Sequence, residues 1–431
     1  MARIYGAVRE FDPMPAQVTA LRSNVGAVRK AQNTMLDNVK QKLDAKESIS
    51  WTPISLHTEW RNIREEKAPW YEECSKEAFQ DGCSRLSSAL KNWSDSRKGK
   101  RKGKKVEFPK FRKRGTRDSW SFTAGRMVTD SVVKIPRVGH VALKEPLHIP
   151  EGSRVTMWTV RERAGRWFLT VRIREDSWTK PEKKPTAYVV GIDLGVGDDF
   201  ATFPDRSKIK NPRFLKQDHK RLRKAHKAVS RKPRPKNPKD TSKRREEAVQ
   251  RLQRVYFDVT NRRQDFLHKL TTDLVKSHDV IVLEDLNNAG MARKKGFRLG
   301  KSVSDACLRE FRRQVEYKSE WYGTTVIIAD RWFPSSKLCS TPGCGYKNQD
   351  LELKELEWTC PECGRTHDRN VNASRNLTGY GERLLAGSFP VLPGIPGMAR
   401  GDGARPPLVA VVGETGMEAR DVGLLASVSR K

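Results

Sequence analysis

The sequence predicts an α+β protein of several domains, and three observations support this prediction. A chain of 431 residues is long enough for two to four domains. Apolar residues recur at helical spacing between residues 18 and 93, and they alternate as in β-strands between residues 119 and 174. Two later runs, residues 187–195 and 278–287, are apolar until each meets a carboxylate, which is typical of strands in an α/β sheet.

The charge of the chain indicates a polyanionic partner. It has 85 Lys and Arg against 52 Asp and Glu, a formal charge of +33 and a pI near 10.1. The alternative is a merely soluble basic surface, but an excess this large would repel itself unless phosphates neutralised it, so we expect nucleic acid. No apolar run is long enough to span a bilayer and no signal peptide precedes Met1, so we expect a cytoplasmic protein with reduced thiols and no membrane partner.

The first hundred residues predict one strand followed by helices. Residues 3–8 form the strand, and Pro13 and Pro15 separate it from a helical pattern that runs from Val18 to Leu43. A second helical pattern covers residues 67–93, and its regularly spaced aromatic residues predict a packed core rather than base-stacking platforms. These helices carry no chemistry of their own.

Residues 97–117 are a dense run of Lys and Arg interrupted by Phe108, Pro109 and Phe111. Charge of one sign at this density does not fold alone, so we interpret the run as a phosphate-binding loop that its Phe residues anchor to a neighbouring domain. The alternatives are a nuclear-type address and a solvated linker. The predicted contacts to nucleic acid are Lys98, Lys100, Arg101, Lys102, Lys104, Lys105, Lys110, Arg112, Lys113 and Arg114.

Residues 119–174 predict a β domain. The strand at 155–160 is joined to the strand at 167–171 through a turn at Arg163 to Arg166. The opening strand at 3–8 is expected to join this domain, with the helices as an insertion.

Two strands then each deliver a carboxylate. Asp193 interrupts the apolar run at 187–195, and Glu284 ends the run at 278–287. Burying a carboxylate in a strand is costly unless a divalent cation lies against it. The alternative for Asp193 alone is an ordinary turn after a strand. Two such cases far apart in sequence predict a metal site where the strands of an α/β sheet end.

Residues 211–278 lie between these two strands and predict two basic helices separated by a Pro and Lys segment at 232–241. Their apolar residues are expected to pack on the sheet, and their charged faces to follow a nucleic-acid backbone or face water. The predicted contacts are Arg221, Arg223, Lys224, Arg231, Arg244 and Arg245. An amphipathic helix at 302–322 and a strand at 325–330 follow.

Four cysteines predict a structural zinc ribbon. Cys339 and Cys344 form one pair and Cys360 and Cys363 the other, a spacing that allows four thiolates to surround one Zn²⁺ tetrahedrally. The alternative, a disulfide pair, requires an oxidising compartment.

Five segments follow one another in a specific order: GIDLG at 191–195, LEDL at 283–286, FPSSK at 333–337, the four cysteines, and HDRNVNASRN at 367–376. Together they resemble the TnpB family of transposon-encoded RNA-guided nucleases, which are related to miniature type V CRISPR effectors. The resemblance covers nearly the whole chain to about residue 379.

The resemblance implies the following domains: a wedge-type β-barrel at 1–10 and 118–180, a helical recognition domain with the basic loop at 11–117, an RNase H-like RuvC nuclease domain at 181–330 and 365–379, a zinc ribbon at 331–364 and a disordered tail at 380–431. It also implies a guide RNA, a double-stranded DNA target beside a short motif, a monomer on one RNA, and a bacterial or archaeal cytoplasm.

The resemblance further implies that Asp193 bridges two Mg²⁺ ions and that Glu284 binds one of them. The family segment usually reads His-Asp-Arg-Asp and its second Asp is the third metal ligand, whereas this chain has Asn370 at that position. Three explanations remain open: Asp368 replaces the missing ligand, the protein binds its target without cutting it, or Asn370 is a deliberately introduced substitution. The two intact carboxylates favour a working nuclease, and His367 is interpreted as a structural neighbour of the ribbon.

Overall fold

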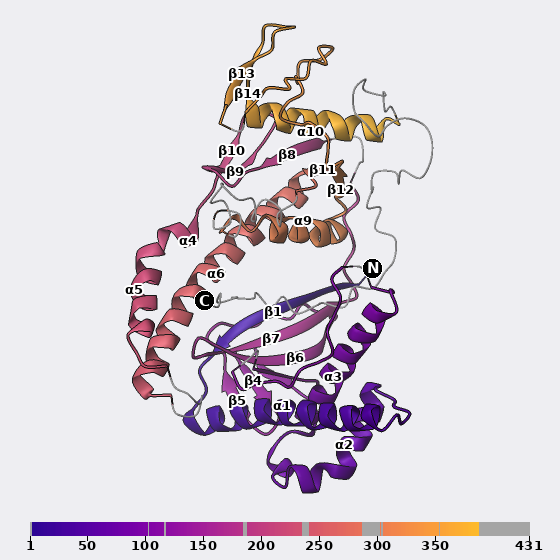
Figure 1. The fold of residues 1–431 in the computed structure, drawn as a ribbon, viewed down its shortest axis with the longest axis vertical. Coiled ribbons are helices and arrows are strands. Elements are labelled where there is room, and N and C mark those ends of the chain that lie inside the picture. Colours follow the sequence, from indigo (N-terminus) through magenta and orange to yellow (C-terminus); the bar gives the residue numbers. More distant parts are fainter. Residues whose placement is uncertain are drawn as a thin grey trace. The chain divides into compact units, whose positions relative to one another are not determined.

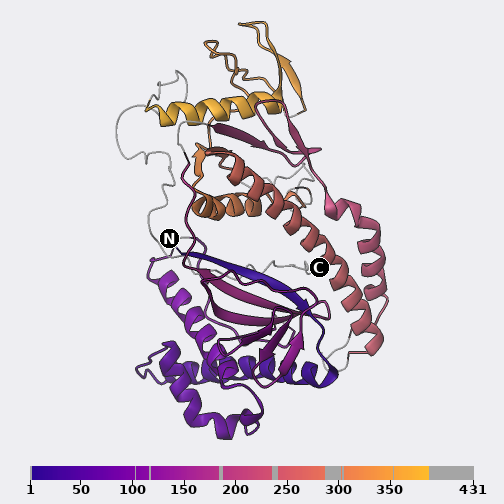
Figure 2. The same ribbon diagram turned by 180° about the vertical axis from the view of Figure 1, so that it is seen from behind.

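The structure is a computed structural model that describes residues 2–101, 103–115, 118–183, 188–234, 241–286, 302, 305–352 and 354–387. These residues divide into two compact units, the first up to Trp178 and the second from Thr179 on (Figures 1 and 2). Lys102 of the predicted basic contacts and residues 388–431 of the predicted tail lie outside the described residues. Within the described part of the chain, no helix has the length and apolar character needed to cross a membrane.

Two antiparallel sheets form the β part of the first unit. One has the order β1 (Arg3–Phe11), β7 (Arg166–Glu175), β6 (Ser153–Arg163), β2 (Ser119–Phe122), and the other is β3 (Arg126–Thr129), β4 (Val132–Ile135), β5 (Gly139–Ala142). The opening strand therefore pairs with a strand more than 150 residues later. A bridge between Phe11 and Leu143 links the end of β1 to the segment after β5. Closure of these strands into one barrel stays a prediction.

Three helices pack with these sheets around one core: α1 (Pro15–Asp44), α2 (Pro53–Lys67) and α3 (Lys76–Arg97). The prediction of one helical block at 67–93 was wrong at its start. Pro69 cannot continue a helix, so α2 ends at Lys67, and α3 begins only after Ser75, whose hydroxyl accepts a hydrogen bond from the Glu77 backbone. Within the predicted block, Phe79 is buried and stacks at 5.2 Å on the buried Trp60 of α2, which confirms that Phe79 is core. Trp70 is 38% exposed and Trp93 is half-buried, so the prediction does not hold for all the aromatics of the block.

The described part of the basic loop, residues 98–115, forms neither helix nor strand. Phe108 packs edge-on against Trp93 at 5.0 Å, as expected of an anchor, whereas the Phe111 ring is 47% exposed. Arg112 differs from its neighbours because its guanidinium donates to Gln32 of α1 and its backbone pairs with Asn33. The other described basic residues of the predicted contact set in this loop are exposed.

A five-stranded mixed sheet is the centre of the second unit. Its order is β10 (Lys208–Lys210), β9 (Asp199–Thr202), β8 (Val189–Leu194), β11 (Val280–Glu284), β12 (Thr325–Ala329). β8, β11 and β12 are parallel, and β9 and β10 are antiparallel to their neighbours. Residues at alternate positions of β8 and β11 pack on different helices, so the sheet is covered on two faces.

Helices α6 (Lys243–Ser277) and α9 (Leu308–Tyr322) cover one face of this sheet, and α10 (Arg369–Leu385) covers the other (Figure 1). α4 (Phe214–Gln217) and α5 (His219–Ser230) precede α6, and α5 runs beside α6 in both views (Figures 1 and 2). α9 begins later than the predicted residue 302. α10 continues to Leu385, so residues 380–385 are helical, because Tyr380 is buried against the sheet.

Gly191 lets α10 approach β8 closely. A Cβ atom there would lie 2.4 Å from the Ser374 carbonyl oxygen and 2.4 Å from the Thr378 nitrogen. The Gly191 N–H donates to the Thr378 hydroxyl at 2.9 Å, and its carbonyl accepts from the Ser374 hydroxyl at 2.7 Å. The helix is therefore fastened to the strand two residues before Asp193.

Gly191→Ala is expected to destabilise the protein by roughly 1–3 kcal/mol, since overpacking a tight contact forces the backbone apart. The measurement is chemical unfolding followed by circular dichroism. Gly197→Ala is the matched control, because its added Cβ would meet nothing within 4 Å. Equal unfolding midpoints for the two variants would contradict the close-packing argument.

A candidate two-carboxylate site beside a four-cysteine cluster

Asp193 and Glu284 lie side by side on one face of the sheet. The ladder between β11 and β8 pairs Leu283 with Ile192, so the next residue on each strand is Glu284 and Asp193. Val282 of β11 packs in one core with Leu377 of α10. Because side chains alternate along a strand, Glu284, two residues after Val282, and Asp193 beside it lie on the face that α10 covers. The structure thus brings together the two carboxylates that the sequence predicted.

Burial raises the pKa of both carboxyl groups. Burial and the neighbouring Glu284 raise the pKa of Asp193 to about 8, and Arg369 and Lys208 oppose this rise. Burial also raises the pKa of Glu284, although the hydrogen bond that the Ser335 hydroxyl donates to it acts in the other direction. Two acids that resist ionisation together favour a divalent cation between them, and carboxylate oxygens are ligands that Mg²⁺ prefers.

Asp368 has a different role in this structure. It is the N-cap of α10, and one carboxylate oxygen accepts hydrogen bonds from the Asn370 and Val371 backbones at 2.9 and 3.0 Å. The other oxygen accepts from Lys208 at 2.6 Å. Burial raises the pKa of Asp368, but the Lys208 and backbone hydrogen bonds outweigh it and the net pKa is lowered.

Asn370 lies in the first turn of α10 and is partly exposed. Among the described residues, the four cysteines are the one group of three or more His, Cys, Asp or Glu side chains arranged to hold a metal ion. Asp368 therefore does not complete a three-acid cluster with Asp193 and Glu284, and Asn370 is not an acid.

Two asparagines of α10 position the segment between β12 and the cysteines, and sequence reasoning did not single them out. Asn376 donates to the carbonyls of Ser335 and Leu338 at 2.7 and 2.6 Å, and Asn372 donates to Leu338 at 2.7 Å and accepts from the Ser340 N–H at 2.9 Å. These contacts hold Ser335 against Glu284. The spacing of the two Asn residues, four apart on one helix face, was the available signal.

The four cysteines converge as predicted. The Sγ atoms of Cys339 and Cys363 are 3.7 Å apart, those of Cys344 and Cys360 are 3.6 Å apart, and all four lie within 4.8 Å of one another. Four sulfurs at about 2.3 Å from a tetrahedral Zn²⁺ would be separated by about 3.8 Å, so the arrangement fits a structural zinc ion. β13 (Glu357–Thr359) and β14 (Thr366–Asp368) form the adjoining hairpin.

His367 lies beside this cluster rather than beside the carboxylates. Its Nε2 atom is 3.2 Å from the Cys339 sulfur, and its ring contacts Trp358 across the hairpin. The next residue, Asp368, caps α10, so the cysteine cluster and the carboxylate site share one continuous segment.

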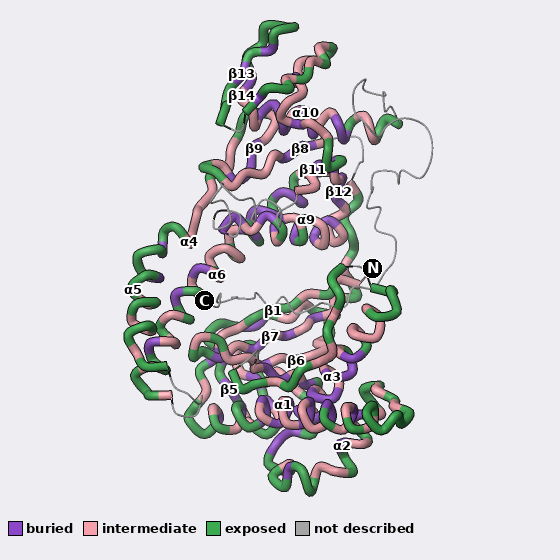
Figure 3. Tube along the Cα trace, viewed as in Figure 1, coloured by how far each residue is buried: buried purple, intermediate pink, exposed green. Residues whose placement is uncertain are grey.

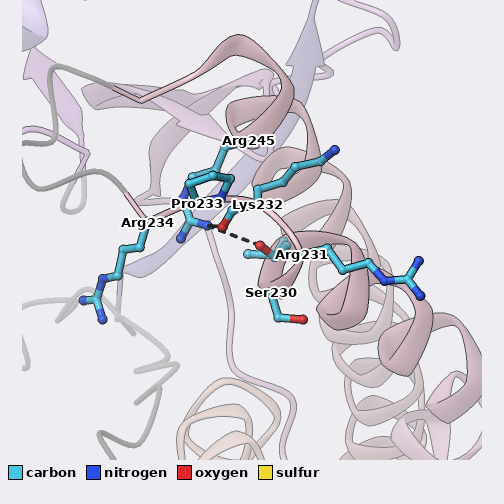
Figure 4. Close-up of a pocket in the computed structure, with 7 residues that line it drawn as sticks. Ser230, Arg231, Lys232, Pro233, Arg234 and Arg245 are labelled. Carbon is cyan, nitrogen blue, oxygen red and sulfur yellow. Dashed lines mark hydrogen bonds between the residues drawn. The ribbon is translucent and has the colours of Figure 1, made fainter.

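The basic residues of α5 and the start of α6 divide into two sets. Arg223, Lys224, Arg231 and Arg244 are exposed and form no ion pair with another described residue, and Figure 3 shows α5 as mostly exposed. Arg221 pairs with Asp218 at 2.8 Å, and Arg245 donates to the carbonyls of Val229 and Lys232. Arg245 closes a shallow pocket of about 540 Å³ at the end of α5, from which Arg231 and Arg234 extend in different directions (Figure 4).

Two family models match the chain between residues 168 and 377. One, described as "Probable transposase", matches residues 168–295, and the other, described as "Cas12f1-like, TNB domain", matches residues 309–377. The second match spans the cysteines and the start of α10.

Known relatives match over most of the chain. A protein of Streptomyces pristinaespiralis named "Putative RNA-guided DNA endonuclease" is 35% identical over 407 residues, which is 92% of this chain and 90% of that protein. "Putative RNA-guided DNA endonuclease InsQ" of Escherichia coli K12 is 26% identical and covers 90% of this chain and 94% of its own. A solved structure of CasPhi-2 (Cas12j) bound to crRNA is 9% identical over 88% of this chain and 98% of that one, with a TM-score of 0.42.

Proposed function

Because this chain belongs to the TnpB family, we propose that it is an RNA-guided DNA endonuclease that cuts at Asp193 and Glu284. It binds a guide RNA, recognises a short motif beside its DNA target and hydrolyses a phosphodiester. The observation that carries this proposal is the register of β8 and β11, which sets two carboxylates with raised pKa values side by side on one face.

Asp193 and Glu284 would hold Mg²⁺, which when bound supplies Lewis-acid stabilisation of the charge that develops during phosphodiester hydrolysis. The chain's own residues prepare that site. Ser335 orients the Glu284 carboxylate, and Ser374 and Thr378 fix the strand that carries Asp193. Lys208 neutralises Asp368 and so reduces the negative charge around the two acids.

The two units of the structure correspond to different domains of the proposed nuclease. The mixed sheet with α6, α9 and α10 acts as the RuvC-like nuclease domain, and the cysteines bind a structural Zn²⁺ in the inserted ribbon. The first unit acts as the wedge and recognition domains. The exposed basic residues of the loop at 98–115 and of α5 contact the guide RNA and the DNA backbone, which suits a chain of charge +33.

The test is to purify the protein with its co-expressed RNA and to incubate it with a plasmid that carries the matching target. Linear product that requires both the matching sequence and Mg²⁺ supports the proposal. Tight binding with an intact plasmid would instead support a DNA-binding protein without cleavage, the function that Asn370 would favour.

Asn370→Asp is expected to lower the Mg²⁺ concentration needed for half-maximal cleavage by roughly 10- to 100-fold, because an added acidic group strengthens the hold on the metal. The measurement is a Mg²⁺ titration of plasmid cleavage. Asp368→Ala is the companion variant: it removes the cap of α10, so it should cost about 0.5–2 kcal/mol of stability and leave the Mg²⁺ requirement unchanged. An Asp368→Ala variant that loses Mg²⁺ binding would show that Asp368 replaces the missing ligand.

A further inference from the structure

Trp332 is the most exposed large hydrophobic residue among those described in the second unit, at 79% exposure. It lies in the turn that follows β12, and its ring has no aromatic or cationic partner in the described part of the chain. A single exposed apolar residue is common and by itself indicates nothing. What distinguishes Trp332 is where its turn is attached.

Both ends of this turn are attached at Glu284. Before the turn, Ala329 pairs with Glu284 in the ladder between β12 and β11. After the turn, the buried Ser335 donates its hydroxyl hydrogen to the Glu284 carboxylate. Trp332 lies between these two contacts, three residues from each, and is therefore close to the proposed catalytic carboxylate.

The turn is also held in one conformation. The Trp332 N–H donates to the Asp330 carboxylate at 2.8 Å, and the Phe333 N–H donates to the Asp330 carbonyl at 3.0 Å. The Phe333 ring packs against Tyr380 of α10 at 4.9 Å. The indole of Trp332 is thus presented to solvent by a backbone that is bonded on both sides, which lowers the entropy cost of binding a ligand.

The residue before Trp332 in the chain is a cation. Arg331 is exposed, and its guanidinium bonds to Asp285, the residue after Glu284. Asp285 also accepts from Arg312 at 2.8 Å, and Arg312 in turn pairs with Glu316 at 2.8 Å, so these two arginines and two carboxylates balance in charge. Proteins that bind single-stranded nucleic acid stack its bases on exposed aromatic rings, and Trp332 offers such a ring in a chain of charge +33.

We propose that Trp332 stacks on a nucleobase of the DNA strand at the carboxylate site and thereby positions the phosphodiester to be cut. This inference rests on the proposed nuclease function. We choose a nucleobase as the ligand because each base has a flat face that can stack on an indole, and because the turn that carries Trp332 is attached to Glu284 at both ends.

The test compares Trp332→Leu, which keeps an apolar side chain but cannot stack, with Trp332→Phe, which can. We expect Trp332→Leu to slow single-turnover cleavage roughly 5- to 150-fold, the range that corresponds to the loss of one base–aromatic stack, and Trp332→Phe to retain most of the rate. Leu356→Ala, a change without effect on charge at a 67% exposed residue of the ribbon, is the control and should cut normally.

A second readout does not depend on cleavage. In an Asp193→Asn background without Mg²⁺, an oligo(dT) strand with one 2-aminopurine should lose fluorescence on binding. The loss should be larger with Trp332 intact, or with the Trp332→Phe variant, than with the Trp332→Leu variant. Equal quenching by all three proteins, or Trp332→Leu cleavage within twofold of wild type, would overturn the inference. If the wild-type protein does not cut at all, the nuclease proposal fails and the quenching result alone decides whether Trp332 stacks.

Discussion

Asp193→Ala is expected to lower the rate of DNA cleavage by roughly 10³-fold or more, because metal-ion stabilisation is worth several kcal/mol and each 1.36 kcal/mol is tenfold. Asp193 is one of two carboxylates that the sheet register sets together, and the partner alone does not hold the cation. The measurement is single-turnover plasmid linearisation by the protein with its co-expressed RNA.

Asp205→Ala is the control for this variant. Asp205 is an exposed acid in the turn before β10, where it bonds to Ser207, and its replacement should leave the rate unchanged. Cleavage by Asp193→Ala at a rate close to that of Asp205→Ala would remove Asp193 from the proposed site.

The raised pKa of Asp193 predicts how Mg²⁺ binding depends on pH. The pKa of Asp193 is raised from 3.8 to about 8, so between these values the folded protein keeps a proton that the unfolded chain has lost. The contribution of this group to stability is therefore present at low pH and falls as pH rises toward 8. Because a bound cation must displace that proton, the increase in melting temperature on adding Mg²⁺ should grow with pH in this interval and be absent in Asp193→Asn.

Cys360→Ser is expected to abolish stoichiometric zinc binding and to unfold the ribbon. Structural zinc sites in small peptides contribute about 10–16 kcal/mol to folding, and the residues around these cysteines have a small core of their own. The loss of structure should extend to the carboxylate site, because Asn372 bonds both to Ser340, the residue after the first cysteine, and to the carbonyl of Ser335. Elemental analysis and limited proteolysis between residues 339 and 363 measure the two effects.

Cys74→Ser provides the comparison for the zinc experiment. Cys74 is buried in the first unit, where burial raises the pKa of its thiol to about 11, and it lies outside the cysteine cluster. The variant should lose stability and keep one zinc ion per chain. A Cys360→Ser protein that keeps its zinc would rule out the proposed ribbon.

The features that sequence reasoning identified are those whose signal is local. Asp193 and Glu284 interrupt apolar strands, and the two cysteine pairs have a spacing that zinc requires. The family assignment followed from five such segments and is confirmed by relatives that match over most of the chain. The later start of the second helical block was also readable, because Pro69 cannot continue a helix, but the regular aromatic spacing obscured it.

The sequence by itself determined that this chain carries two strand carboxylates, four zinc-type cysteines and a large positive charge, because residue type and spacing decide each of these. The tertiary structure decided which groups meet. It set Asp193 beside Glu284 through a strand register, committed Asp368 to capping α10 and pairing with Lys208, and placed Trp332 in a turn attached to Glu284 at both ends. These contacts join residues up to 160 positions apart in sequence, and hydrogen bonds over such separations leave no periodic pattern to read.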